Sequence, residues 1–282
     1  MHSNVLITGS RGQLGTMLSQ LLPDAVAVDM DKLDITDATA VNTFVKLHGI
    51  DTIVNCAAYT AVDKAEDEPE LAYKVNAYGA EVLAKTGCRI VHISTDYVFD
   101  GTSNRPYTPD DLPNPVSVYG KSKLAGEKAV LEYADVAAII RTSWMYSPYG
   151  NNFVKTMLRL GAEKTSINVV CDQVGSPTYA GDLANAIVSI LPRLMKNTRG
   201  VYHFANEGVC SWYDLSVGVM QSANLNCVVM PVLSAAYPTR AIRPFYSVLD
   251  KTKVRCEFGL SIPHWRSSLM RCIHEIQKIS KI

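Results

Sequence analysis

A tyrosine and a lysine four positions apart are the residues of this chain best suited to chemistry. Tyr119 and Lys123 stand in a segment that favours a helix, and positions i and i+4 of a helix share one face. A phenol normally keeps its proton up to a pKa of about 10, and a nearby ammonium group lowers that pKa. The pair predicts proton exchange with a carbonyl or alcohol oxygen near neutral pH, although the same spacing is common on solvated helix faces.

A hydroxyl group is expected beside this pair. Thr95 follows a strand-like run at 90–94, so its hydroxyl would point to the mouth of a parallel sheet. From there Thr95 could donate a hydrogen bond to the same oxygen that Tyr119 would protonate. The three groups are chemically matched and stand at matched positions of the predicted fold.

A glycine-rich segment near the start of the chain predicts a nucleotide site. The spacing is GxxGxxG, between a strand-like run at 4–8 and a helix candidate at 13–22. Glycines let the backbone approach a pyrophosphate closely, and a helix N-terminus offers free N–H groups and a partial positive charge. The cofactor contacts expected from this loop are Gly9, Arg11, Gly12, Gln13, Leu14 and Gly15.

The choice between NADH and NADPH stays open. Asp29 lies 20 residues after Gly9, at the end of the second strand-like run. A carboxylate there can accept hydrogen bonds from the adenosine ribose, which favours NADH. Arg11 would favour NADPH if it paired with a 2′-phosphate, but it also reads as a solvated loop charge. Further cofactor contacts are expected beside the adenine at Asp34 and Ile35, and beside the nicotinamide ribose at Ala57, Ala58 and Tyr59.

Strand-like and helix-like segments alternate through the first 140 residues. The strand-like runs are 4–8, 25–28, 52–54, 90–94 and 136–140, and the helix candidates are 13–22, 38–48, 69–86 and 117–133. Such alternation predicts right-handed βαβ units, with helices on both faces of a parallel sheet. The expected fold class is α/β, a Rossmann-type doubly wound parallel sheet whose ligands bind beyond the carboxyl ends of the strands.

The alternation loosens after about Trp144, where prolines and glycines punctuate the chain. Strands are expected at 167–170 and 201–204, a helix at 182–191 and another at 265–279. This pattern predicts a smaller C-terminal substrate-binding domain, interleaved with the first domain. The expected division gives 1–142 and about 178–205 to the dinucleotide-binding domain, and about 143–177 and 206–282 to the substrate-binding domain.

The charges of the 282 residues cancel, with 27 Lys+Arg against 27 Asp+Glu. Zero net charge disfavours nucleic acid as a partner and a polybasic membrane anchor. The 48% of hydrophobic residues are enough for a packed core. Residues 1–150 carry 12 basic and 19 acidic side chains, whereas residues 151–282 carry 15 and 8. The second part is therefore the one suited to an anionic ligand.

The remaining sequence features predict a cytoplasmic protein without metal or membrane partner. Seven scattered cysteines without a CxxC motif favour reduced thiols over disulfides or a zinc site. No signal peptide is visible before the first strand-like run. The longest uncharged stretch, 215–239, contains Pro231 and Pro238 and makes a poor membrane span. The acidic run at 63–70 opens a helix and is more typical of a solvated face than of a metal site.

Together these motifs resemble the extended short-chain dehydrogenase/reductase superfamily and, within it, the dTDP-4-dehydrorhamnose reductase family. The resemblance spans nearly the whole chain. Its most specific strings are STDYVFDG at 94–101 and YGKSKLAGE at 119–127. The other matching segments are 12–15, 33–36, 55–63, 141–144, 172–178, 211–213 and 243–244.

The resemblance implies a reaction and a catalytic set. The family reduces the 4-keto group of dTDP-6-deoxy-L-lyxo-4-hexulose to give dTDP-L-rhamnose, using NADPH or NADH, in polysaccharide biosynthesis. Carried over, Tyr119 would protonate the oxygen and Thr95 would hold it. Lys123 would lower the pKa of Tyr119 and bind the nicotinamide ribose. Some members of the family form dimers through a metal, so a homodimer is compatible with the resemblance, but no metal ligands can be placed in this chain.

The resemblance also implies contacts with the sugar nucleotide. Asp96 and Trp144 match positions that contact it, although a tryptophan after a strand is also typical of core packing. Arg243 is a candidate for the substrate diphosphate because a guanidinium can bind phosphate oxygens with two hydrogen bonds; a surface salt bridge is the alternative. Asn76 matches an asparagine of the superfamily and is expected to stabilise the site.

Two other functions stay open on the sequence. One is another sugar-nucleotide reductase or a 4-epimerase of the same superfamily, which would share the cofactor and the catalytic set. The other is a regulatory subunit with this fold and no activity. The intact set of Thr95, Tyr119 and Lys123 argues against the regulatory subunit, because a binding partner needs none of the three.

Overall fold

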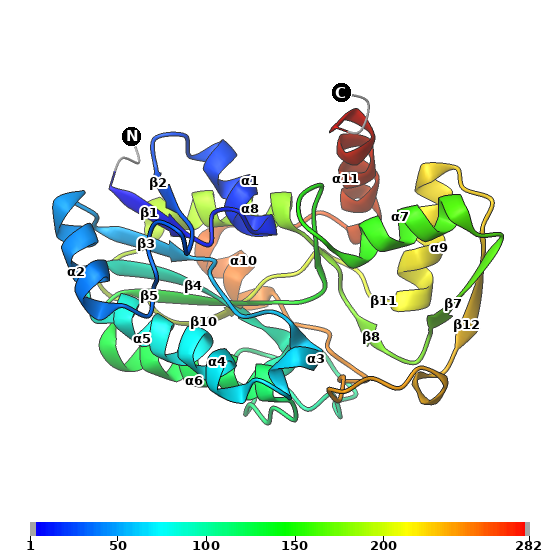
Figure 1. The fold of residues 1–282 in the computed structure, drawn as a ribbon, viewed down its shortest axis with the longest axis horizontal. Helices are drawn as coiled ribbons and strands as arrows, with labels where there is room; N and C mark the ends of the chain where they lie inside the picture. Colours follow the sequence, from blue (N-terminus) through cyan, green and yellow to red (C-terminus); the bar gives the residue numbers. More distant parts are fainter. Residues whose placement is uncertain (1–3, 280–282) are drawn as a thin grey trace.

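A parallel six-stranded sheet forms the larger lobe of the computed structural model, which describes residues 4–279 (Figure 1). Its order is β10-β5-β4-β3-β1-β2. The chain reverses its direction of travel at β1, and ligands bind at such a switch point. The strands are β1 (Val5–Thr8), β2 (Val26–Val28), β3 (Thr52–Asn55), β4 (Arg89–Thr95), β5 (Ala137–Thr142) and β10 (Arg199–His203).

Helices cover both faces of this sheet, which confirms the predicted doubly wound α/β fold. On one face, α1 (Gln13–Leu21), α8 (Ala180–Ile190) and α10 (Thr252–Phe258) share one apolar core with the strands. On the other face, α2 (Ala38–Leu47), α5 (Gly79–Ala84) and α6 (Val118–Tyr133) enclose a second core. The strands are buried on both sides, which explains why they read as continuous apolar runs.

The helix predicted at 69–86 is present but contains a π turn. It consists of α4 (Pro69–Tyr73), the π turn η1 (Lys74–Tyr78) and α5. Such turns are rare and occur most often at functional sites. The turn contains Asn76, whose contacts are described below.

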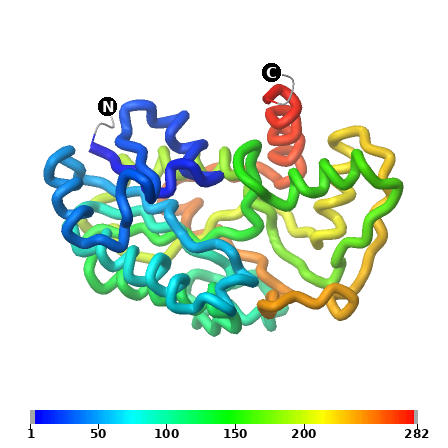
Figure 2. Tube along the Cα trace, in the orientation of Figure 1, coloured from blue at the N-terminus to red at the C-terminus, as the bar shows by residue number. Residues whose placement is uncertain are grey.

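The second lobe has its own core beside the sheet. It is built from α7 (Phe153–Glu163), α9 (Trp212–Ala223), α11 (Trp265–Ile279) and the parallel pair β7 (Ser166–Val170) and β12 (Val228–Val232). Figure 2 shows the trace entering this lobe in green, returning to the sheet in yellow-green and leaving it again in yellow. The two lobes are therefore interleaved along the chain. One element departs from the expected division, because α10 falls within 206–282 but packs its Val254 and Phe258 against the sheet.

Short elements complete the described chain, and several border the space between the lobes. They are α3 (Val62–Ala65), η2 (Asp96–Val98), β6 (Met145–Tyr146), β8 (Val174–Gly175), β9 (Thr178–Tyr179), η3 (Leu191–Arg193), β11 (Cys210–Ser211) and η4 (Ser234–Ala236). Within residues 4–279, no helix is long and apolar enough to span a membrane. The seven cysteines all lie in this range and none forms a disulfide.

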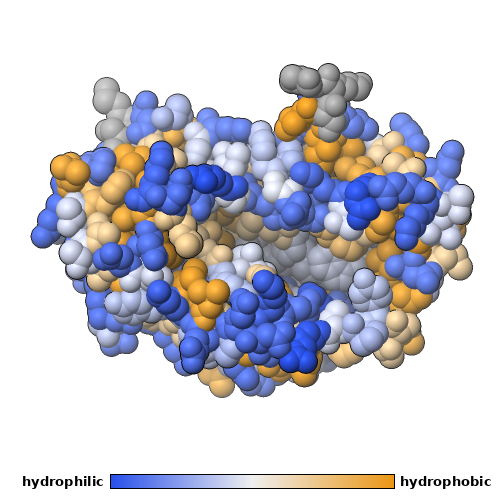
Figure 3. All heavy atoms as spheres, viewed as in Figure 1, coloured by the Kyte–Doolittle hydropathy of each residue, from blue (hydrophilic) through white to orange (hydrophobic). Residues whose placement is uncertain are grey.

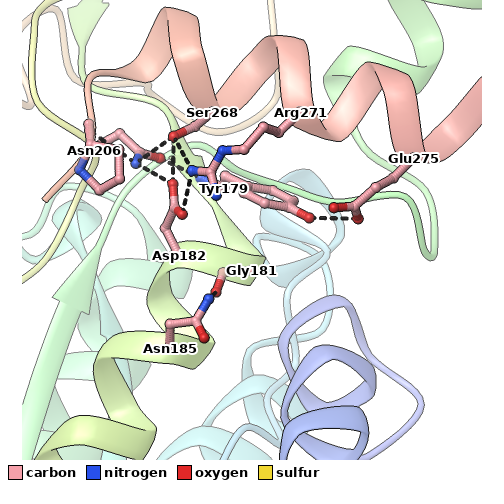
Figure 4. Close-up of polar contacts among 9 residues, drawn as sticks. Tyr179, Gly181, Asp182, Asn185, Asn206, Ser268, Arg271 and Glu275 are labelled. Carbon is pink, nitrogen blue, oxygen red and sulfur yellow. Dashed lines mark hydrogen bonds and ion pairs between the residues drawn. The ribbon is translucent and has the colours of Figure 1, made fainter.

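A buried carboxylate joins the C-terminal helix to the first lobe (Figure 4). Asp182 of α8 accepts hydrogen bonds from Asn206 Nδ2 at 2.7 Å, Ser268 Oγ at 2.5 Å and Arg271 Nη2 at 2.6 Å. Asp182 is only 6% exposed. Because Ser268 and Arg271 belong to α11, this carboxylate fixes the last helix of the second lobe against the sheet lobe.

Candidate functional site

The glycine loop packs tightly between β1 and the segment after β3. Gly9 has a φ of +65°, and a Cβ there would lie 2.7 Å from the backbone nitrogen of Ala57. At Gly15 a Cβ would collide with the carbonyl of Gly9. The side chain of Leu14 lies in the apolar core, so the cofactor contact predicted for Leu14 would come from its backbone.

The start of α1 fits the pyrophosphate of a dinucleotide. Its N-cap is Gly12, and within the described chain no side chain caps this helix start and no acidic residue lies in its first turn. The first N–H groups of a helix have no partner inside the helix, so they remain available to an anion at the carboxyl end of β1. Backbone groups, not side-chain charges, thus make this part of the site.

Two charged residues border the loop where the adenosine ribose is expected. The carboxylate of Asp29 accepts hydrogen bonds from the backbone nitrogens of Arg11 at 3.0 Å and Met30 at 2.9 Å. The guanidinium of Arg11 forms an ion pair with Asp31, and both side chains are exposed. Asp29 and Arg11 therefore lie at the same edge of the loop. Backbone N–H groups hold the carboxylate of Asp29 in place, whereas the guanidinium of Arg11 is held only by an exposed ion pair.

The next expected pair shapes the turn after β2. Asp34 accepts hydrogen bonds from the backbone nitrogen and the hydroxyl of Thr36, both at 2.8 Å, and these lower the pKa of Asp34. The side chain of Ile35 is 6% exposed and packs in the core against Gly79 of α5, so the contact predicted for Ile35 stays a prediction for its backbone. Only the backbone of Ile35 is left to face an adenine.

Asn76 holds the segment after β3, where Ala57, Ala58 and Tyr59 lie half-buried. Its Oδ1 accepts from the backbone nitrogen of Tyr59 at 2.8 Å, and its Nδ2 donates to the Tyr59 carbonyl at 3.0 Å. The same Nδ2 lies 3.0 Å from the hydroxyl of Ser122, which stands between Tyr119 and Lys123 on α6. These bonds agree with the stabilising role expected for Asn76.

The predicted catalytic hydroxyls meet at the carboxyl end of β4. Thr95 is the last residue of β4, and Tyr119 lies in the first turn of α6, which Ser117 caps by accepting from the Gly120 nitrogen at 3.1 Å. The hydroxyl of Thr95 lies close enough to the Tyr119 phenol to lower its pKa, against the larger opposing effect of burial. The ring of Tyr97 packs edge-on against that of Tyr119, with 5.5 Å between centroids. The structure thus brings together two groups that lie 24 positions apart.

A buried carboxylate lies next to these hydroxyls. Asp96 is 2% exposed, and its Oδ1 accepts a hydrogen bond from the Thr95 hydroxyl at 3.0 Å. Its Oδ2 has no partner among the described residues. Burial raises the pKa of Asp96 to about 6. An unpaired acceptor in a buried position is suited to a hydroxyl group of a ligand.

Lys123 lies on the same face of α6 as Tyr119, and its ammonium bonds to the main chain of β4. Its ammonium donates to the carbonyl of Ile93 at 2.7 Å. Burial lowers the pKa of Lys123 to about 8. The lowering of the Tyr119 pKa expected from Lys123 stays a prediction, while burial raises that pKa above its ordinary value. The reason is desolvation, which disfavours both the phenolate and the ammonium.

Two residues of the second lobe complete the candidate site. Trp144 has a φ of +48°, which is strained for a bulky side chain, and its ring stacks on Trp212 with 3.7 Å between centroids. Arg243 forms an ion pair with Asp63 at 2.7 Å and donates to the Tyr97 hydroxyl at 3.0 Å. The salt bridge foreseen for Arg243 is therefore present, and the same side chain also reaches the neighbour of Tyr119.

Figure 3 shows the face of the molecule hollowed between the two lobes. The chain matches the family model described as RmlD substrate binding domain over residues 3–278. This chain belongs to that family. The predicted membership among the dTDP-4-dehydrorhamnose reductases is confirmed by relatives of nearly equal length.

One such relative is the dTDP-4-dehydrorhamnose reductase of Aggregatibacter actinomycetemcomitans, which is 41% identical over 285 residues and covers 95% of this chain and 97% of its own. A solved dTDP-4-dehydrorhamnose reductase from Clostridium acetobutylicum has a TM-score of 0.93 at 41% identity, covering 97% of this chain and 99% of its own. The enzyme from Bacillus anthracis, solved in complex with NADP, has a TM-score of 0.93 at 42% identity and covers 98% and 100%.

Several contacts of this RmlD-family chain were not foreseen. The side chain of Gln13, expected at the cofactor, accepts hydrogen bonds from Ser147 Oγ at 3.2 Å and Asn152 Nδ2 at 3.1 Å, so it also joins the glycine loop to the second lobe. Tyr97 and Trp212 lie in segments 94–101 and 211–213, which resemble the family. That resemblance was the feature of the sequence that could have pointed to these two residues. Among the described residues, no cluster of three or more histidine, cysteine or acidic side chains is arranged to hold a metal.

Proposed function

We propose that this chain reduces the 4-keto group of dTDP-6-deoxy-L-lyxo-4-hexulose (dTDP-4-dehydrorhamnose) to give dTDP-L-rhamnose, in polysaccharide biosynthesis, with NADPH or NADH as the reductant. The observation that carries the proposal is that the Tyr119 phenol and the Thr95 hydroxyl lie near each other at the carboxyl end of β4. It stands in a chain about 40% identical, over at least 95% of its length, to proteins named for this reduction.

The residues divide the work of a ketone reduction. The glycine loop and the start of α1 would hold the pyrophosphate of the cofactor, which supplies a hydride when bound. Tyr119 is protonated at neutral pH, as a phenol with its pKa at or above the ordinary value must be, and it would donate that proton to the C4 oxygen. Thr95 would turn its hydroxyl from Asp96 Oδ1 to donate a hydrogen bond to the same oxygen and thereby stabilise the charge that develops there. Lys123 would bind the nicotinamide ribose.

Recognition of the sugar nucleotide is proposed for residues of both lobes. The unpaired Oδ2 of Asp96 would accept a sugar hydroxyl, and the exposed part of the Trp144 ring would pack on the substrate. Arg243 would exchange Asp63 for the diphosphate, whose oxygens can also accept two hydrogen bonds from a guanidinium. In the proposed division, residues 1–142 and about 178–205 form the dinucleotide-binding domain together with α10. The remaining residues form the substrate-binding domain.

The test is Tyr119→Phe, followed by the loss of NADPH absorbance with a dTDP-4-keto-6-deoxyhexose. Removal of a general acid lowers kcat by ~10²-fold or more, while binding of NADPH persists. The matched control is Tyr133→Phe, at the 41% exposed end of the same helix. Near-normal turnover in the Tyr119 variant would refute the assignment. A wild type that consumes no NADPH would favour a 4-epimerase, if it interconverts sugars, or a regulatory subunit, if it does not.

The cytoplasm and a homodimer complete the proposal. The seven free thiols support a reducing compartment, and cell fractionation tests this location.

Large apolar side chains stay exposed on α4 and the π turn, among them Leu71, Tyr73 and Tyr78, and such surfaces favour association. Light scattering at micromolar concentration tests the dimer, which a mass of 30.9 kDa would refute.

A further inference from the structure

A buried glutamate continues the face of α6 that carries Tyr119 and Lys123. Glu127 lies four positions beyond Lys123, so the three side chains follow one another along one side of the helix. The carboxylate of Glu127 accepts hydrogen bonds from Ser94 Oγ at 2.5 Å, and from Arg141 Nε at 2.9 Å and Nη2 at 2.7 Å. Glu127 and Arg141 are 2% and 3% exposed.

This pair joins the elements that carry the proposed catalytic groups. Ser94 precedes Thr95 on β4, Arg141 lies on the neighbouring strand β5, and Ser94 and Arg141 face each other in the sheet register. Glu127 therefore fixes the helix bearing Tyr119 to the strand bearing Thr95. A buried ion pair contributes little net stability compared with apolar residues of the same volume, so stability alone gives no reason for charges at this place.

We propose that Glu127 is a positioning residue for the reduction. It locks the reactive face of α6 onto β4 and β5, and it places a negative charge one helical turn from the ammonium of Lys123. The role of Glu127 in catalysis rests on the proposed function. Its effect on the ammonium of Lys123 does not depend on that function.

The surroundings of Lys123 make Glu127 its important charged neighbour. Burial raises the pKa of the Cys56 thiol to about 12, so this thiol is neutral near pH 7. Burial lowers the pKa of His92 well below its ordinary value, so this imidazole is neutral as well. Tyr119, one turn earlier, keeps its proton. The charge of Arg141 is paired with Glu127, and Glu127 opposes the lowering of the Lys123 pKa by burial.

The experiment compares Glu127→Gln and the double variant Glu127→Gln/Arg141→Met with the wild type. The double variant leaves no unpaired buried guanidinium, so it decides the outcome if the single variant does not fold. Two pH titrations are recorded: kcat/KM with NADPH and the 4-keto sugar nucleotide, and the ¹³Cε NMR shift of Lys123 in the protein without ligands. The resonance is assigned with Lys123→Met. The control is Glu132→Gln, on the exposed part of the same helix.

We expect the midpoint of the Lys123 titration to fall from about 8 by about one pH unit or more in Glu127→Gln, and by less in the double variant, which also removes the positive charge of Arg141. The alkaline limb of kcat/KM should move with it, while the control keeps both midpoints. A uniform loss of kcat/KM with an unmoved midpoint would overturn the inference, since it would indicate a structural role only. A shifted NMR midpoint in a chain without reductase activity would refute the proposed function and leave the electrostatic role of Glu127 standing.

Discussion

Replacing Asp96 by asparagine should make the chain more stable at neutral pH and a poorer enzyme. Asp96 is almost completely buried, and its Oδ2 has no partner among the described residues. Burial raises its pKa from the 3.8 of an ordinary aspartate to about 6, against the opposing effect of the Ser247 and Thr95 hydroxyls. The folded chain therefore carries a charge that it stabilises poorly, at a place suited to a ligand hydroxyl.

The magnitude follows from the size of the shift. A difference of about two pKa units, at about 1.4 kcal/mol each, makes ionised Asp96 cost the folded state up to about 3 kcal/mol. Between these two pKa values the folded chain binds more protons than the unfolded chain, so the stability of the wild type falls as pH rises through this window. The cost is absent below about pH 4 and complete above about pH 6.

The assay is urea unfolding of the wild type and Asp96→Asn, followed by circular dichroism. The variant should gain less than about 1 kcal/mol at pH 4, between about 1 and 2 at pH 5, and about 3 at pH 7. Its kcat/KM for the sugar nucleotide should fall about tenfold or more, as expected when a buried hydrogen-bond acceptor for substrate is changed. A residue that lowers stability for the sake of binding is common at functional sites.

The matched control is Asp100→Asn, in the same loop region. Hydrogen bonds, led by that from the Asn114 side chain, lower the pKa of Asp100. The pKa shift of Asp100 is therefore opposite in sign to that of Asp96. Its stabilising effect is complete above the ordinary aspartate pKa and is lost as pH falls, and the control variant should be less stable than the wild type at neutral pH. An Asp96 variant that is no more stable than the wild type at pH 7, or whose gain does not depend on pH, would refute the reasoning.

Three further substitutions test other parts of the structure. Asp182→Ala should cost about 3–5 kcal/mol in urea unfolding because it leaves buried donors unpaired, whereas Arg271→Met, whose side chain is 49% exposed, should cost under about 1 kcal/mol; equal costs would contradict the buried anchor. Trp144→Ala should raise KM for the sugar nucleotide about tenfold or more with NADPH binding unchanged, and an unchanged KM would assign this ring to packing alone. Gly9→Ala should abolish NADPH binding measured by fluorescence titration, because of its positive φ and the backbone against it, while Gly49→Ala, with a similar φ and open space, should bind normally.

The sequence alone determined the sheet lobe and the positions of its reactive groups. The strands and helices predicted in the first 140 residues are confirmed to within a few residues. The glycine spacing, the i, i+4 pair Tyr119 and Lys123, and Thr95 after a strand are local patterns. They depend on backbone periodicity and on turn geometry, which neighbouring residues largely set.

The second lobe was harder to predict. Helices α7, α9 and α10 and strand β12 were not foreseen. Their segments contain few of the alternating signals found earlier, and their order comes from packing around Trp265 and against the sheet. Tertiary burial routinely overrides weak local preference in this way.

Only the tertiary structure decided how the reactive groups are tuned. It turned the ammonium of Lys123 toward a strand carbonyl, stacked Trp144 on Trp212, and buried Asp96 with a free oxygen. It also placed Arg141 beneath Glu127. Spacing along the chain shows which side chains share a helix face, but a pKa depends on the water and charges removed or brought near by segments distant in sequence. The sequence thus determined which groups are present, and folding decided which of them carry charge.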